Sequence, residues 1–387
     1  EVRTADELWA ALESDATVIA LMNDITIESY HRDIVLNGKQ LVGMPYLNCE
    51  MTHVRPKLTQ IFASVDSVYR DSCITLENNS KLADIDVECR VYSPYGPLQV
   101  IKVNSGRAEF EDVSFIFNIA DIKGAGNYTL FSNKATIMLV DNVEISLLFN
   151  NYVNARNYVT VFGLDSYGTE PVGTVMTATN CVDLNISARE VTRRYIGSLY
   201  IAQGQRFMFN GKLNMDLEAS YIYMFQGSDV ILNGETTALL NSINGGSYYI
   251  FNGGKARIGG NLTLIDNFNG RSQLVLTNNG ATTISGNVTS GCPYDCQLDE
   301  GSTNTLTGSG SMTLTQDGIG INYCVGQGFL PRFATPACFT GTLETCPKDE
   351  NYVRCSCAGY EFPDSCESYE AIAECRDGSL RICTYAL

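Results

Sequence analysis

Basic residues are fewer than acidic residues in this chain, which bears on whether it binds an anionic partner. Among 387 residues there are 26 Lys and Arg against 43 Asp and Glu, which gives a formal net charge of −17. Binding to nucleic acid or to an anionic lipid surface depends on Lys and Arg neutralising phosphates. We therefore expect no nucleic-acid partner and no polybasic attachment to a membrane surface.

Histidine is almost absent, and this limits metal chemistry. The only two histidines are His31 and His53. Cys355 and Cys357 form a C-x-C pair, but no C-x₂-C or His-x₃-His segment accompanies it, as zinc sites require. We expect no metal site, no other cofactor and no catalytic residue set.

Long apolar runs are also missing. No segment approaches the roughly 18 apolar residues of a membrane span, so we expect none. Hydrophobic residues are 44% of the chain and charged residues 18%, so most of the chain is expected to fold around buried apolar surface. The chain begins at Glu1 with no charged-then-apolar leader, so we expect a processed product.

Cysteine, in contrast, is abundant and unevenly placed. Four of the 14 cysteines precede residue 200 and ten lie from Cys292 onward, which is typical of disulfides in an oxidising compartment. We predict an extracellular or cell-surface protein whose signal peptide has been removed. Cys73 and Cys89 are 16 residues apart and are candidate partners; the other pairings stay open. The predicted disulfide cysteines are Cys49, Cys73, Cys89, Cys181, Cys292, Cys296, Cys324, Cys338, Cys346, Cys355, Cys357, Cys366, Cys375 and Cys383.

One helix is expected, at the N-terminus. Thr4 and Glu7 have the Ser/Thr-x-x-Glu spacing of a capping box, in which each side chain satisfies a free backbone N–H. Leu8, Trp9 and Leu12 follow at near-helical spacing. The pattern predicts a short amphipathic helix from about residue 5 to residue 13.

After residue 18 the chain repeats short apolar strands that end in Asn, Gly or Asp. Examples are Val100–Val103 followed by Asn104-Ser-Gly106, and Val230–Leu232 followed by Asn233-Gly234. The turns recur about every 20 to 40 residues, on the scale of a repeat architecture. Such units bury their apolar faces by stacking, and Asn and Gly suit sharp corners. A β-sandwich or a propeller is the structural alternative.

The opening segment carries a family resemblance. Val2–Glu13 followed by Val18–Ile27 resembles the start of pectate-lyase-like β-helix domains of secreted and surface-anchored proteins. The resemblance is close over the first 30 residues or so. From there to about Asn287 it is limited to the general strand-and-turn pattern. It implies an all-β fold, a right-handed parallel β-helix (solenoid) with a short capping helix. It does not decide activity, because that group contains adhesive and structural domains as well as enzymes.

We predict three parts. They are the capping helix at 1–15, the parallel β-helix at 16–320, and a small disulfide-rich C-terminal module at 321–387. The module is expected to need disulfides because its core would be too small to hold it.

A candidate acidic cluster is the alternative to a non-catalytic protein. Asp84, Asp86 and Glu88 occupy alternate positions and would share one strand face, as a cation site or a polysaccharide-cleaving site could require. They alternate with Ile85 and Val87, which also indicates an ordinary solvated face over an apolar one.

Sugar chemistry has two further candidates. The tyrosine pairs Tyr221/Tyr223 and Tyr248/Tyr249 suit either sugar stacking or stacking between coils. Five sequons are candidate glycosylation sites: Asn78, Asn127, Asn185, Asn261 and Asn287.

The function we expect is that of a secreted, non-catalytic adhesive or structural protein, with head-to-tail self-association into a surface appendage or matrix and an extracellular carbohydrate or cell-surface partner. The alternatives are a polysaccharide lyase or glycoside hydrolase acting on acidic polysaccharide, and a carbohydrate-binding module.

Overall fold

The computed structural model describes most of the first 266 residues and short pieces of the rest. The described residues are 1–28, 34–47, 53–63, 72–92, 98–120, 127–150, 158–163, 173–190, 198–219, 221–240, 247–249, 255–266, 273–275, 281–284, 288–290, 295–296, 306–307, 312–314, 342–343, 373–376 and 379–382. They form two compact units, Glu1–Leu199 with Met208–Glu218, and Tyr200–Phe207 with Ala219–Leu387.

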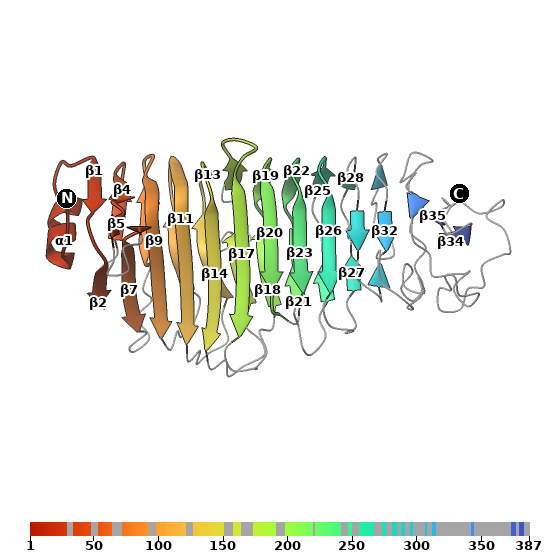
Figure 1. The fold of residues 1–387 in the computed structure, drawn as a ribbon, viewed down its shortest axis with the longest axis horizontal. Coiled ribbons are helices and arrows are strands. Elements are labelled where there is room, and N and C mark those ends of the chain that lie inside the picture. The colour runs from red at the N-terminus through yellow and green to blue at the C-terminus, as the bar shows by residue number, and fades with distance from the viewer. Residues whose placement is uncertain are drawn as a thin grey trace. The chain divides into compact units, whose positions relative to one another are not determined.

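The N-terminal helix is as predicted. Helix α1 spans Ala5–Glu13, and both hydrogen bonds of the capping box between Thr4 and Glu7 are present. Leu8 is fully buried, and the helix contacts the first strands of unit 1. Figure 1 shows α1 lying across the end of this unit, where it covers apolar core that the first coil would otherwise expose.

Unit 1 is a stack of coils whose strands form three parallel ladders (Figure 1). The first ladder joins β1 (Val18–Leu21), β4 (Gln40–Gly43), the starts of β9 (Lys81–Tyr92) and β11 (Arg107–Ala120), β13 (Thr136–Leu139) and β16 (Thr174–Thr177). The second joins β2 (Ile25–Glu28), β7 (Lys57–Ala63), the ends of β9 and β11, β14 (Val143–Asn150), β17 (Asp183–Glu190) and β20 (Lys212–Leu217). The third joins β3 (Ile34–Asn37), β8 (Ile74–Glu77), β10 (Leu98–Val103), β12 (Asn127–Asn133) and β15 (Tyr158–Gly163).

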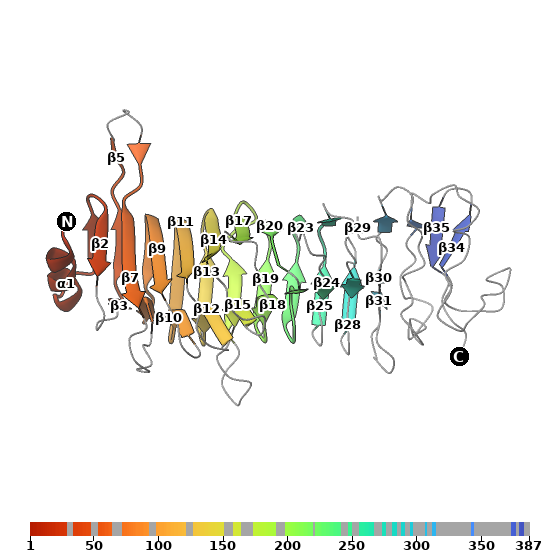
Figure 2. The ribbon, with the colours of Figure 1, turned by 90° about the horizontal axis from the view of Figure 1, so that it is seen from below.

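Two strands are divided between the units, and an antiparallel hairpin interrupts the second coil. β18 (Ser198–Gln203) and β19 (Arg206–Phe209) contribute residues to both units. β5 (Tyr46–Leu47) and β6 (His53–Val54) form the hairpin between β4 and β7. Figure 2 shows this hairpin standing away from the ladders.

Unit 2 repeats the parallel arrangement. Its ladders are β22 (Asp229–Leu232), β25 (Lys255–Ile258), β28 (Ala281–Ile284) and β31 (Leu306–Thr307); β23 (Thr236–Leu240), β26 (Leu262–Asp266), β29 (Val288–Ser290) and β32 (Met312–Leu314); and β21 (Tyr221–Tyr223), β24 (Ser247–Tyr249), β27 (Gln273–Val275) and β30 (Asp295–Cys296). Near the C-terminus, β33 (Thr342–Leu343), β34 (Ala373–Arg376) and β35 (Ser379–Ile382) pair antiparallel. The fold is therefore all-β and solenoid-like with parallel ladders, compatible with a β-helix; this pairing does not fit the sandwich alternative.

The interior of unit 1 is filled by stacked apolar side chains. Phe115 packs against Phe110 and Phe131 with ring centroids 4.9 and 5.0 Å apart, and Phe131 stacks on Phe162 at 5.0 Å. All four rings are at most 1% exposed. Each coil thus buries its apolar face against the next one, as expected for units that cannot form a core alone.

Corners between ladders use Asn and Gly, as predicted. Gly38, Asn78 and Gly106 all have left-handed backbone, with φ of 67°, 51° and 69°. The Asn78 side chain also donates to Asn37 Oδ1 at 2.6 Å, which links two coils at the same corner. These residue types avoid the steric cost that a positive φ imposes on larger side chains.

Candidate functional site

The three carboxylates of the predicted acidic cluster do not share one strand face. β9 pairs with β4 through Lys81–Ala83 and with β7 through Asp86–Tyr92, so that Asp84 lies at the corner between the first and second ladders. Asp84 has a φ of 51°, and the pairing of β9 with β11 skips it. Asp84 still alternates with buried Ile85, but it precedes the residues of β9 that pair with β7. It therefore lies at the corner and not on the second-ladder face that carries Asp86 and Glu88, so the predicted shared face is wrong for Asp84.

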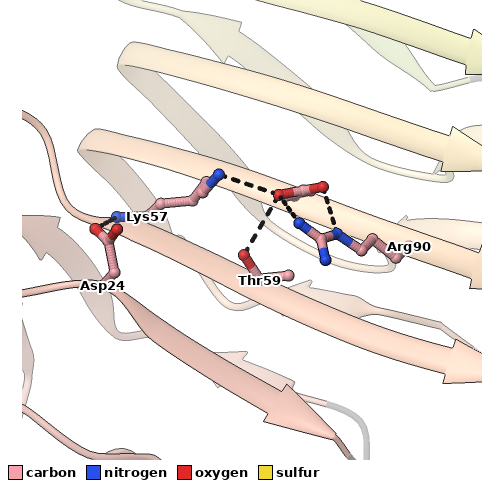
Figure 3. A network of polar contacts seen from close by, with 5 residues as sticks. Asp24, Lys57, Thr59 and Arg90 are labelled. Atoms are coloured by element: carbon pink, nitrogen blue, oxygen red, sulfur yellow. Dashed lines mark hydrogen bonds and ion pairs between the residues drawn. The ribbon is translucent and has the colours of Figure 1, made fainter.

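Glu88 lies on the outer side of the second ladder and is surrounded by partners. Its carboxylate lies 3.2 Å from Lys57 Nζ and accepts hydrogen bonds from Arg90 Nε at 2.5 Å and Arg90 Nη2 at 3.1 Å. Thr59 Oγ1 is 3.5 Å away, on the same strand as Lys57. Figure 3 shows these side chains converging on the carboxylate from two neighbouring strands, β7 and β9. Only 7% of the Glu88 side chain is exposed.

Asp86 is held by a different base. Arg55 Nε lies 3.3 Å from Asp86 Oδ1, and Arg55 Nη1 donates to the Asp112 backbone carbonyl at 2.7 Å. Arg55 therefore extends from the second coil across β9 to the bend of β11. In the first coil, the Asp24 carboxylate accepts the Lys57 backbone N–H at 2.9 Å (Figure 3). Together with the contacts of Arg55, these interactions link four successive coils.

Burial and charge move the two carboxylates in opposite directions. Burial raises the pKa of Asp86, and the nearby Glu144 and Asp24 add to this, while Arg55 and Lys57 oppose it. Burial also acts to raise the pKa of Glu88, but hydrogen bonds from Arg90 and Lys57 outweigh it and the pKa is lowered. Glu88 is thus a fixed, ionised acceptor, whereas Asp86, with 28% of its side chain exposed, is the carboxylate that solvent reaches.

The bend of β11 carries a third shifted carboxylate. Asp112 has a φ of 51°, like Asp84 one coil earlier. Its burial raises the pKa of the Asp112 carboxyl, and Asp141 and Asp84 add to the effect. Within the described ranges, no group of three or more His, Cys, Asp or Glu side chains is arranged to hold a metal ion.

The basic members of this network were not identified from the sequence. Lys57 and Thr59 alternate on β7, and Arg55 lies two residues before Lys57, at the end of the 13-residue excursion 44–56 between β4 and β7. That Lys57 lies beside Asp86 in the next coil therefore could not be predicted from the sequence. The pattern Arg-x-Lys-x-Thr lies opposite the pattern Asp-x-Glu-x-Arg of the next coil. If the register of the two strands had been known, these patterns would have predicted the network.

The cysteines divide into a bonded pair and a free thiol where they are described. Cys73 and Cys89 form a disulfide, which confirms that pairing, and both are fully buried. Cys181 is exposed and is a free thiol, which differs from the expected disulfide. The remaining predicted disulfide cysteines, from Cys49 to Cys383, have side chains outside the described residues, so their pairing stays a prediction.

The sequons and tyrosines can be placed in part. The Asn78 amide donates to Asn37, Asn185 Oδ1 accepts from Asn214 at 2.9 Å, and Asn261 is exposed. The side chains of Asn127 and Asn287 lie outside the description. Glycosylation at all five stays a prediction.

Tyr223 stacks on Tyr200 with ring centroids 4.6 Å apart and 9% of Tyr200 exposed, which is stacking between coils. The side chains of Tyr221, Tyr248 and Tyr249 lie outside the described part.

Among the described residues, no helix has the length and apolar character needed to cross a membrane. Comparison of the chain with protein-family models, with curated proteins and with solved structures finds no match.

Proposed function

We propose that this chain is a secreted, non-catalytic β-helix protein of the right-handed, pectate-lyase-like type, acting as an extracellular adhesive or structural component. The observation that carries the proposal is the pairing of Asp86 with Arg55 and of Glu88 with Lys57 and Arg90. Carboxylates held in this way link coils, and Glu88 is too buried to meet a polymer substrate. Hydrolysis of a glycosidic bond needs two carboxyl groups that flank it.

The Cys73–Cys89 disulfide supports the proposed location. Structural disulfides persist in oxidising compartments and are rare where thiols are kept reduced. This bond joins Cys73, directly before β8, to the second-ladder part of β9, in the interior of unit 1. Mass spectrometry of the protein recovered from its source, with free thiols blocked during lysis, tests whether the bond forms there.

A polysaccharide lyase or glycoside hydrolase is the second candidate, and one observation favours it. Asp86 and Glu88 are two residues apart on one face, and their pKa values are shifted in opposite directions, as in acid and base pairs of enzymes. The three basic side chains beside them are each about one-third exposed, at 35 or 36%, and would suit an acidic sugar.

Incubation with a panel of uronic-acid polymers, with and without calcium, separates the two functions. The proposal predicts no release of oligosaccharides, and retention on an immobilised polymer or cell-surface material without product. Product that disappears in Asp86→Asn but persists in Glu144→Gln, an exposed carboxylate on β14 two strands away, would establish the enzyme instead.

Self-association is part of the proposed role. A head-to-tail contact between copies propagates into a filament when it does not close on itself. Because α1 covers the first coil of unit 1, such a contact would use the outer side of the helix rather than free strand edges. Sedimentation velocity and negative-stain imaging at increasing protein concentration test this, and a monomer at every concentration would remove self-assembly from the proposal.

A further inference from the structure

Three methionines lie in line on the outer side of the first ladder of unit 1. Met138 in β13 is in register with Met176 in β16. In both strands the flanking residues on either side are buried and the methionine is half-buried. Both thioethers therefore face outward from adjacent coils.

Met208 extends this line by one coil. It occupies the third position of β19, as Met138 and Met176 do in their strands, and is likewise half-buried between buried neighbours. β19 pairs with β16, and Asn210 N donates to Thr177 Oγ1 at 3.0 Å; from this pairing and the equal strand lengths we infer that Met208 lies beside Met176. Three of the nine methionines of the chain thus form one column, which we call the methionine ladder.

We propose that the methionine ladder binds a soft monovalent cation, copper(I) or its analogue silver(I), through three thioether sulfurs. Adjacent parallel strands are about 4.8 Å apart, so the two outer methionines are separated by roughly 10 Å at the backbone. Unbranched Met side chains with three rotatable bonds can close that gap and meet at one ion. Thioethers prefer copper(I) to zinc, calcium or magnesium, which take nitrogen, thiolate or oxygen ligands.

The surroundings of the ladder suit a cation of this kind. Glu109 is the next residue along the same column, in register with Met138, and it carries a carboxylate that is paired with Arg107. Thr136 and Thr174, two residues before Met138 and Met176 on the same strands, are uncharged. Arg206, two residues before Met208, is paired with Asp229. The chain as a whole carries a net charge of −17, which favours a cation over an anion.

The experiment uses silver(I), which is redox-stable, and the full chain with its free thiols blocked by N-ethylmaleimide. Methionine methyl groups carry ¹³C, and their NMR signals are followed during titration. We expect three of the nine methyl signals to shift together and to saturate near one equivalent of silver(I). Met176→Leu, which removes the central ligand with little change in volume, is expected to weaken binding by at least about tenfold.

Controls decide the outcome. Met44→Leu removes a methionine that is 45% exposed and outside the ladder, and silver(I) affinity should stay unchanged. Zinc(II) and calcium(II) at the same concentration should leave the three signals in place. The proposal is overturned if the ladder signals do not move, if Met44 shifts with the same midpoint, or if both Met176→Leu and Met138→Leu retain wild-type affinity while keeping the wild-type circular dichroism spectrum.

Discussion

Removal of the Cys73–Cys89 disulfide should destabilise unit 1 by an amount set by the length of the loop that the bond closes. The perturbation is the double variant Cys73→Ala/Cys89→Ala. The bond closes a loop with a sequence separation of 16 residues. In the loop-entropy model a cross-link of that span stabilises the folded state by about 3 kcal/mol, because it restricts the unfolded chain. Loss of two buried sulfur atoms adds roughly 1 kcal/mol for each site.

The assay is equilibrium unfolding in urea, followed by fluorescence. Trp9 is the only tryptophan of the chain and lies in α1, so its emission reports on unit 1 alone. Unfolding is measured for wild type and the double variant, each with and without reductant. Subtraction of the reductant effect in the variant removes the contribution of every other disulfide and of the lost sulfur atoms.

The remaining difference should be about 3 kcal/mol, with the oxidised wild type the more stable. A difference below about 1 kcal/mol would refute the reasoning, because the bond would then not restrict the unfolded chain in the way its span requires. Peptide mapping that finds free thiols at both positions in wild type would refute the disulfide itself.

Three further predictions concern the coils and their ends. Glu88→Gln should lower the free energy of unfolding by about 2 kcal/mol at neutral pH, because Lys57 and Arg90 lose their anionic partner, while the exposed control Glu144→Gln should change it by less than about 0.5 kcal/mol in urea unfolding. Since the pKa of Glu88 is lowered on folding, its contribution is present above its ordinary value of 4.5 and is lost as the pH falls through the folded value, so the difference between wild type and Glu88→Gln should shrink below pH 4.5. Leu8→Ala, at a fully buried position of α1, should cost about 3 kcal/mol and shift the Trp9 fluorescence midpoint; an unchanged midpoint would mean that the helix does not cover the core. Gly43→Ala places a Cβ 2.0 Å from the Asp84 carbonyl oxygen and should lower the free energy of unfolding by roughly 3 kcal/mol. In Gly204→Ala the new Cβ meets no atom within 4 Å, and the left-handed φ of 64° alone should cost about 1 kcal/mol. Equal shifts of the two variants in calorimetry would contradict the close approach of the coils at Gly43.

Local signals in the sequence predicted local structure well. The capping box of Thr4 and Glu7 predicted the helix, and the structure places it at Ala5–Glu13, because a cap depends on residues three or four positions apart. The repeated strand-and-turn pattern predicted parallel stacking, and Asn and Gly marked left-handed corners such as Asn78 and Gly106. The Cys73–Cys89 pairing followed from its spacing and is confirmed.

The contacts between coils could not be predicted from the sequence. Lys57 meets Glu88 across 31 residues and Arg55 meets Asp112 across 57, and loops of unequal length hide which residues are neighbours. Asp84 was assigned to the same strand face as Asp86 and Glu88 because the alternation with Ile85 and Val87 gives no sign that the left-handed corner falls at Asp84. A pattern of alternation therefore predicted a strand but not the one residue at which the strand turns to the next ladder.

A crystal structure of the full chain would test the central claim most directly, namely that parallel coils stack and that Asp86 and Glu88 serve to join them. It should show Val87 in parallel register with Phe115, Lys57 Nζ beside the Glu88 carboxylate, and Arg55 reaching the Asp112 carbonyl. Antiparallel pairing of these strands, or Asp86 and Glu88 turned together into an open cleft without their basic partners, would contradict it.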